Sequence, residues 1–117
     1  MLNSHNTSPK QKIWHIVSII PEGKVSSYGK VADLAGLPGR ARYVSTALKA
    51  APASLALPWH RVINSQGKIA FTEGSDPFIE QVELLRSEGV TVVRGRVILS
   101  EFEWRPDIAT LVLSIPF

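Results

Sequence analysis

The sequence predicts one α/β domain, a winged helix-turn-helix with small β-hairpins, from three observations. The 117 residues are 44% hydrophobic, which suffices for a single buried core. Apolar residues recur at helical spacing in four segments that glycine and proline separate. Short β-like runs occur near 62–70 and 92–99. We expect a flexible tail at 1–7, the domain at 8–106 and an apolar C-terminal extension of unassigned role at 107–117.

The first helix is predicted to begin at Ser8 and Pro9. Serine is a favoured N-cap, and proline suits the first helical position. The apolar face of this helix consists of five residues at helical spacing, namely Ile13, Trp14, Ile16, Val17 and Ile20. The segment 21–24 contains Pro and Gly and ends the helix.

Two short helices follow, joined by a turn that contains glycine and proline. The first covers about 28–34 with Ser26 or Ser27 as its cap, and the second covers 40–50. This order predicts a helix-turn-helix, although such helix pairs also occur in ordinary protein cores. Arginines at the start of the second helix oppose the helix dipole, which is tolerable where they face phosphates or stacked bases.

The second half is predicted to contain two hairpins with a helix between them. One hairpin covers 62–71 around an Asn-Ser-Gln-Gly turn, and the other covers 91–99 around Gly95. Between them, Asp76 is expected to cap a helix that has Pro77 at its first position.

Charge is distributed unevenly along the chain. Residues 1–70 hold nine Lys and Arg against two acidic residues, whereas residues 71–117 hold four against eight. A basic half with helix-turn-helix spacing indicates a polyanionic partner, and nucleic acid is the natural candidate. The alternative is that these cations are simply solvated surface residues.

The chain contains no cysteine, which excludes a disulfide framework and thiolate chemistry. No metal or cofactor is predicted. No apolar run approaches the roughly 20 residues of a membrane span, and the N-terminus lacks the regions of a signal peptide. We therefore expect a cytoplasmic monomer without membrane contact, associated with the nucleoid through DNA.

The run Pro58-Trp59-His60-Arg61-Val62 places an indole beside an imidazole and a guanidinium where a loop enters a short strand. Such a junction is a common place for a functional site. The alternative is a core tryptophan beside a histidine whose hydrogen bonds are satisfied.

Three segments in order, 23–32, 40–48 and 58–67, resemble the C-terminal domain of the O6-alkylguanine-DNA alkyltransferases. In those enzymes the central motif is Pro-Cys-His-Arg-Val, whose cysteine takes the alkyl group. Trp59 occupies that position here, so the chain resembles the alkyltransferase-like proteins, which bind alkylated guanine without repairing it. The resemblance covers about 8–106.

The resemblance implies roles for residues of the helix-turn-helix. Tyr28 is similar to the tyrosine that helps rotate the target nucleotide out of the duplex, and Arg42 to the arginine finger that fills the vacated stack. Arg40, Ser45 and Thr46 would add DNA contacts. Arg42 as a phosphate contact and Tyr28 as a core residue are the alternatives.

The resemblance also implies a lesion pocket, made of Trp59, His60, Arg61, Val62 and Ser65. His60 and Glu88 match the alkyltransferase proton relay, but without a thiol we favour a structural hydrogen bond between them. Backbone groups of Val62 and Ser65 would lie near the extruded base. The segment 102–106 would flank the pocket.

Two positions depart from the family pattern. Ala51 replaces the asparagine that precedes the site loop, which begins at Pro52 and carries Trp59, His60 and Arg61. Thr72 replaces the aromatic residue or arginine that covers the base in some relatives.

The implied function is a non-enzymatic sensor of O6-alkylguanine in double-stranded DNA. Such a protein would flip the damaged nucleotide, shield it from alkyltransferase and signal to the damage-recognition proteins of nucleotide excision repair. An indole can bind an alkyl group but cannot accept it, because its nitrogen lone pair belongs to the ring. The alternatives are a winged-helix transcriptional regulator and a base-flipping enzyme that uses His60 and Glu88.

Overall fold

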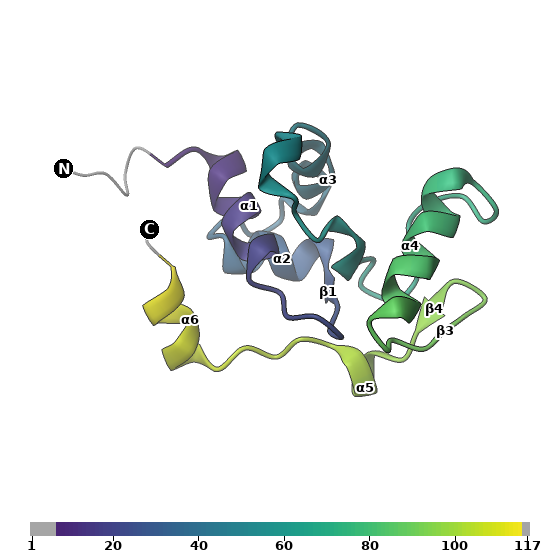
Figure 1. Ribbon diagram of the computed structural model, residues 1–117. Helices are drawn as coiled ribbons and strands as arrows, with labels where there is room; N and C mark the ends of the chain where they lie inside the picture. Colours follow the sequence, from purple (N-terminus) through teal and green to yellow (C-terminus); the bar gives the residue numbers. More distant parts are fainter. Residues whose placement is uncertain (1–6, 116–117) are drawn as a thin grey trace.

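The computed structural model describes residues 7–115, so residues 1–6 of the predicted tail lie outside it, as do residues 116–117. Three helices gather at one end of the molecule, and a fourth helix with a hairpin forms the other end (Figure 1). The elements in chain order are α1 (Pro9–Ser18), β1 (Ser26–Ser27), α2 (Tyr28–Leu34), α3 (Ala41–Lys49), 3₁₀ turns at Ala53–Leu55 and Trp59–Arg61, β2 (Val62–Ile63), α4 (Asp76–Ser87), β3 (Val92–Val93), β4 (Arg96–Val97), α5 (Leu99–Phe102) and α6 (Ile108–Ser114).

The predicted start of α1 is confirmed. The Ser8 hydroxyl accepts a hydrogen bond from the backbone N–H of Gln11, and the Gln11 side chain accepts one from the N–H of Ser8. This reciprocal pair satisfies two N–H groups that a helix start otherwise leaves open. The apolar face of α1 is buried at Ile13, Ile16 and Val17.

The helix-turn-helix of α2 and α3 is confirmed as well. Ser27 caps α2 by accepting the N–H of Lys30. Gly36 and Gly39 in the connecting turn have φ of 78° and 80°, which glycine adopts without strain. The pair is attached to α1 partly through Trp14, whose Nε1 donates a hydrogen bond of 2.7 Å to the carbonyl oxygen of Ala47.

The predicted hairpin of 62–71 is wrong in its pairing. β2 pairs in parallel with β1, Ser26 opposite Val62 and Ser27 opposite Ile63. The Asn64 side chain accepts the N–H groups of residues 66 and 68, which makes a tight turn, and Lys68 then bridges Arg96 instead of returning along β2.

This small parallel sheet separates two hydrophobic cores. Side chains alternate across a strand, so Val62 joins the helical core of α1, α2 and α3. Its neighbour Ile63 joins a second core, with Val25, Ile69, Leu85, Val90, Val92 and Val97. Val25, which precedes β1, and the β2 residues Val62 and Ile63 therefore fix how the two ends of the molecule meet.

The predicted cap of α4 is shifted by one residue. Ser75, rather than Asp76, accepts the N–H of Phe78, so Asp76 and Pro77 lie in the first helical turn. The predicted strand pair around Gly95 is present as β3 and β4 in antiparallel pairing. A Cβ on Gly95 would come within 2.9 Å of the Phe78 ring, so this turn and α4 pack too closely for a larger residue.

The C-terminal segment runs back beneath both cores to α1 (Figure 1). The N–H of Trp104 donates to the Val25 carbonyl at 2.7 Å, and His15 Nε2 lies 2.7 Å from the carbonyl oxygen of Ser114 in α6. The stretch 108–114, which the sequence left unassigned, is thus a short helix with three exposed apolar residues, Ile108, Val112 and Leu113.

Within residues 7–115, no helix has both the length and the apolar character needed to cross a lipid bilayer.

Candidate DNA-binding face and base pocket

Tyr28 and Arg42 line the same hollow of about 500 Å³. Tyr28 is the first residue of α2 and Arg42 lies in the first turn of α3, so the turn between the helices brings them to one face. Burial raises the pKa of the Tyr28 hydroxyl, which keeps it a neutral hydrogen-bonding group. Arg42 is exposed, and within 7–115 its guanidinium has no hydrogen bond or ion pair. It is therefore free to meet a ligand.

A second hollow, of about 300 Å³, adjoins the first. Tyr28, Ser45, Lys49 and Phe71 line both hollows, and Trp59 lines the second. We call the two adjoining hollows together the recess; it lies between α3 and the segment that leads into α4.

Aromatic side chains build the wall at Trp59. The indole meets the Phe71 ring edge-to-face, with centroids 6.1 Å apart at 85°, and it meets His60 in the same manner at 6.1 Å and 88°. Such contacts hold rings in place beyond simple burial. Phe71 was missed by the sequence reasoning, which treated it only as a strand residue.

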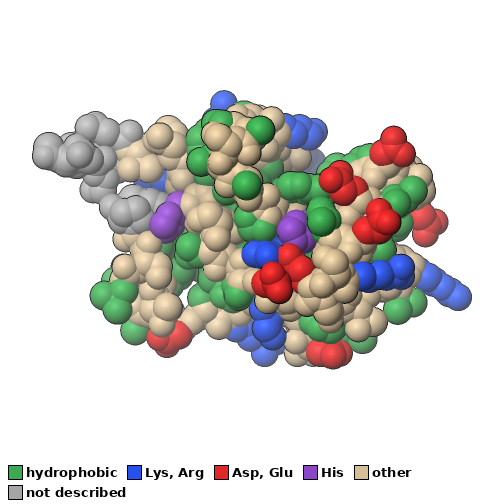
Figure 2. All heavy atoms as spheres, in the orientation of Figure 1, with side chains coloured by type: hydrophobic (Ala, Val, Ile, Leu, Met, Phe, Trp, Pro, Cys, Tyr) green, Lys and Arg blue, Asp and Glu red, His purple; other side chains and the backbone are tan. Residues whose placement is uncertain are grey.

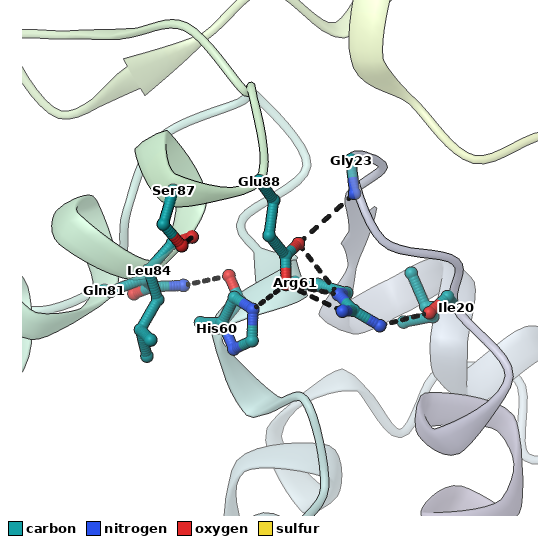
Figure 3. A network of polar contacts seen from close by, with 8 residues as sticks. All are labelled: Ile20, Gly23, His60, Arg61, Gln81, Leu84, Ser87 and Glu88. Atoms are coloured by element: carbon teal, nitrogen blue, oxygen red, sulfur yellow. Dashed lines mark hydrogen bonds and ion pairs between the residues drawn. The ribbon is translucent and has the colours of Figure 1, made fainter.

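Next to Trp59 in the sequence, His60 and Arg61 belong to a polar network that ties the site loop to two distant segments (Figure 3). His60 Nε2 lies 2.8 Å from Glu88 Oε2. Arg61 donates to the same carboxylate from Nε and also from Nη2, the latter at 2.7 Å. Arg61 Nη1 donates to the carbonyl oxygen of Ile20, and the N–H of Gly23 donates to Glu88 Oε1. The network thus joins the end of α1, the site loop and the end of α4.

The network fixes the ionisation of Glu88. Burial alone would raise the pKa of this carboxyl, but the hydrogen bonds from Arg61, His60 and Gly23, with the charge of His60, lower it to about 2. The carboxylate is therefore ionised at neutral pH and can only accept hydrogen bonds. His60 must then donate through Nε2–H, which is the bond expected from the sequence.

Gln81 is a second residue that the sequence reasoning missed. It is buried in α4, and its Nε2 donates to the carbonyl oxygens of His60 and Val62 at 2.9 and 3.0 Å. It lies between Phe78 and Leu85 on the buried face of α4, three residues after one and four before the other. That helical spacing could have identified it as buried.

Several predicted site residues lie elsewhere. The Val62 side chain is buried in the helical core, its carbonyl oxygen accepts a hydrogen bond from Gln81, and Val62 lines neither hollow. His60 and Arg61 stand behind the recess and line neither hollow. Arg40 and Thr46 are exposed outside both hollows, and the Arg40 guanidinium lies 4.9 Å from the Tyr43 ring centroid.

The remaining predicted positions are at or near the recess. Ser65 is exposed and lines the larger hollow with Asn64, while Ser45 lines both. Thr72 lines a third hollow, beside the recess. Ala51 follows α3 and has no polar side chain to brace the site loop. No cluster of three or more potential metal ligands occurs within 7–115.

The family model of the 6-O-methylguanine DNA methyltransferase DNA-binding domain matches residues 8–90. The chain belongs to this family. Within it, the chain is alkyltransferase-like, as the sequence motifs predicted. It is 45% identical over 96 residues to the DNA base-flipping protein of Vibrio parahaemolyticus serotype O3:K6, covering 81% of this chain and 94% of that protein. It is 38% identical over 100 residues to Alkyltransferase-like protein 1 of Schizosaccharomyces pombe, covering 81% and 93%.

Solved structures of the family confirm the fold class. The structure of S. pombe Atl1 in complex with damaged DNA containing O6-carboxymethylguanine matches with a TM-score of 0.76 at 37% identity, over 84% of this chain and 95% of that one. The Mycobacterium tuberculosis OGT structure in complex with DNA matches with a TM-score of 0.57 at 38% identity, over 68% and 48%. Of these two structures, the alkyltransferase-like one has the higher TM-score.

Proposed function

We propose that this alkyltransferase-like protein binds O6-alkylguanine in double-stranded DNA by rotating the damaged nucleotide into the recess beside Trp59, without removing the alkyl group. The observation that carries the proposal is that Tyr28 and Arg42 line one hollow and Trp59 lines an adjoining one, with Tyr28 common to both. The names of the similar base-flipping and alkyltransferase-like proteins, and a relative's complex with damaged DNA, support it.

The side chains suit each step of such binding. Taking a base out of the stack costs a few kcal/mol. A planar guanidinium at Arg42 can replace the lost stacking and hydrogen-bond the orphaned base, which the point charge of a lysine does less well. The apolar walls of Trp59 and Phe71 would favour an alkylated base by roughly 25 cal/mol for each Å² of alkyl surface that they bury.

The recess also lacks the parts of an alkyl-transfer site. The chain has no cysteine, and Trp59 stands at the position of the nucleophile in the family motif. Ser45 lines the recess, but within the described residues its hydroxyl has no hydrogen bond to a side chain that could act as a general base and activate it. The His60–Glu88 pair is engaged with Arg61 outside the recess, and we assign it a structural role.

A protein that binds a lesion without repairing it acts through the effect of the bound complex on other proteins. We propose that the bound state shields the lesion from alkyltransferase and presents it to the damage-recognition proteins of nucleotide excision repair. Support for this step comes from the resemblance to the alkyltransferase-like group.

The direct test is binding to one short duplex that contains guanine and then O6-methylguanine at the same position. We expect tighter binding to the methylated duplex, because only the modified base gains from the apolar wall. The DNA is then recovered and its adduct measured, and we expect the methyl group to remain. Loss of the methyl group in the presence of this protein alone would make it an enzyme, and equal affinity for both duplexes would remove the sensor function.

Trp59→Cys restores the family motif Pro-Cys-His-Arg-Val beside the His60–Glu88 pair, and we expect little or no alkyl transfer from it. Loss of the indole opens the recess and removes the wall that packs on Phe71, so the base is not held at attack distance. A misplacement of about 1 Å can cost roughly 100-fold in rate. Lesion binding should weaken but persist, since Tyr28 and Arg42 remain.

The measurement for Trp59→Cys is the mass of the intact variant after incubation with methylated duplex. A matched sample with unmodified duplex controls for other modification of the thiol. Stoichiometric gain of one methyl group would show that the recess keeps catalytic geometry, contrary to the proposed binding-only role.

A further inference from the structure

Three basic side chains meet at the end of the molecule that lies opposite α1. Lys68 forms an antiparallel bridge with Arg96 of β4, and Arg94 lies in the turn between β3 and β4. All three line one hollow of about 440 Å³. In Figure 2, basic side chains extend from the end formed by the hairpin. We call Lys68, Arg94 and Arg96 the hairpin cations.

Among residues 7–115, the hairpin cations have no partner. All three residues are exposed, and among residues 7–115 none of their side chains has a hydrogen bond or an ion pair. Other guanidiniums of the second half are engaged, since Arg86 donates to the Val92 carbonyl and Arg105 pairs with Glu103. Glu73 lines the hollow too, but it forms no ion pair with the hairpin cations.

The hollow of the hairpin cations adjoins the recess. Asn64, Ala70 and Phe71 line both this hollow and the larger hollow of Tyr28 and Arg42. For a duplex seated on Tyr28 and Arg42, the sugar-phosphate backbone would then pass the segment 64–72, which carries Lys68 and lies beside the hairpin that carries Arg94 and Arg96. Each strand offers one phosphate per 3.4 Å of duplex axis, which suits closely spaced cations.

We propose that Lys68, Arg94 and Arg96 form a second phosphate-binding surface, which extends the DNA contact beyond the helix-turn-helix to the strand next to the flipped nucleotide. This inference rests on the proposed function, because it takes the position of the duplex from Tyr28 and Arg42. It also changes the interpretation of the charge distribution. The acidic half of the sequence contributes two of these three cations, so the DNA contact is not confined to the basic half.

Phosphate contacts and base contacts are distinguished by salt and by lesion dependence. Removal of a phosphate contact weakens binding to every sequence alike and lowers the slope of log K against log salt by about one unit. A contact to the alkyl group or base instead changes the preference for the lesion. If the hairpin cations instead bind an acidic protein segment, their removal would change neither the salt slope nor the preference for the lesion.

The test compares the double variant Arg94→Asn/Arg96→Gln with the wild-type protein on guanine and O6-methylguanine duplexes. Asparagine is chosen at position 94 because φ is 52° there, a conformation that asparagine tolerates better than most residues. The matched control is Lys10→Gln/Lys24→Gln, which removes the same charge from positions that line none of the hollows described above. We expect the salt slope to fall by about two units in the hairpin variant, with the ratio of affinities for the two duplexes unchanged, and to stay constant in the control.

A salt slope equal to that of the wild-type protein would overturn the inference while leaving lesion binding intact, and it would leave an acidic protein as the partner of the hairpin cations. A loss confined to the methylated duplex would overturn it as well, since it would show base recognition. If the double variant does not fold by circular dichroism, Lys68→Gln gives the same test with an expected fall of about one unit. Absence of lesion preference in the wild-type protein would instead count against the proposed function.

Discussion

Arg42→Ala is expected to abolish the signal of a fluorescent base analogue placed at the lesion, which reports the extrahelical nucleotide. Arg42 lines the recess from the first turn of α3, as Tyr28 does from α2, and its guanidinium has no partner among residues 7–115. Without it nothing fills the vacated stack, so the flipped state loses the interaction that offsets unstacking. We expect affinity for methylated duplex to fall by about 2 kcal/mol, or roughly 30-fold.

Arg40→Ala is the matched control for Arg42→Ala, because it removes the same side chain two residues earlier in the sequence. Arg40 lies outside both hollows and packs on Tyr43, so it can contribute at most a phosphate contact. Lys49→Ala should also leave the extrahelical state, although Lys49 lines both hollows and its loss will weaken binding to all duplexes. Equal reduction of the base-analogue signal by all three substitutions would argue against insertion of Arg42 into the duplex.

Glu88→Gln is expected to lower the free energy of unfolding by roughly 3 kcal/mol. Removal of one partner of a buried ion pair leaves the other charge without compensation, which typically costs 3–5 kcal/mol. Here the uncompensated group is Arg61, which is held between Glu88 and the Ile20 carbonyl. The amide keeps part of the hydrogen bonding, so we expect the lower end of that range. Urea unfolding followed by circular dichroism measures the change.

Glu83→Gln controls for loss of an acidic charge from α4, since Glu83 is exposed and forms no ion pair within 7–115; its effect should stay within about 0.5 kcal/mol. The pH dependence gives an independent check. The folded-state pKa of Glu88 is lowered from 4.5 to about 2, so its contribution is fully present above pH 4.5 and is lost as the pH falls toward 2. The wild-type protein should lose about 3 kcal/mol in this window that Glu88→Gln does not lose. Parallel acid profiles of the two proteins would show that Glu88 is not held by the network.

Local sequence was sufficient to predict the parts of the fold that depend on neighbouring residues. Ser8 and Ser27 cap their helices as predicted, because an N-cap is a contact between a side chain and the backbone three residues on. The helix-turn-helix and the strand pair around Gly95 follow from helical periodicity and from turn residues in the same way. The family resemblance added His60 and Glu88, a pair 28 residues apart, which spacing alone could not have joined.

Contacts between distant segments depend on tertiary packing and could not be predicted from local sequence. The parallel pairing of β1 with β2 could not be predicted, because two-residue strands have too little pattern to select a partner, and a local hairpin is the simpler expectation. This pairing turns Val62 into the helical core and leaves Ser65 at the recess. Phe71 and Gln81 acquire their places beside Trp59 and behind His60 only when α4 packs against the site loop. The union of Lys68 with Arg94 and Arg96 likewise depends on a bridge between segments far apart in the chain, because burial of the second core, and not local sequence, brings those segments together.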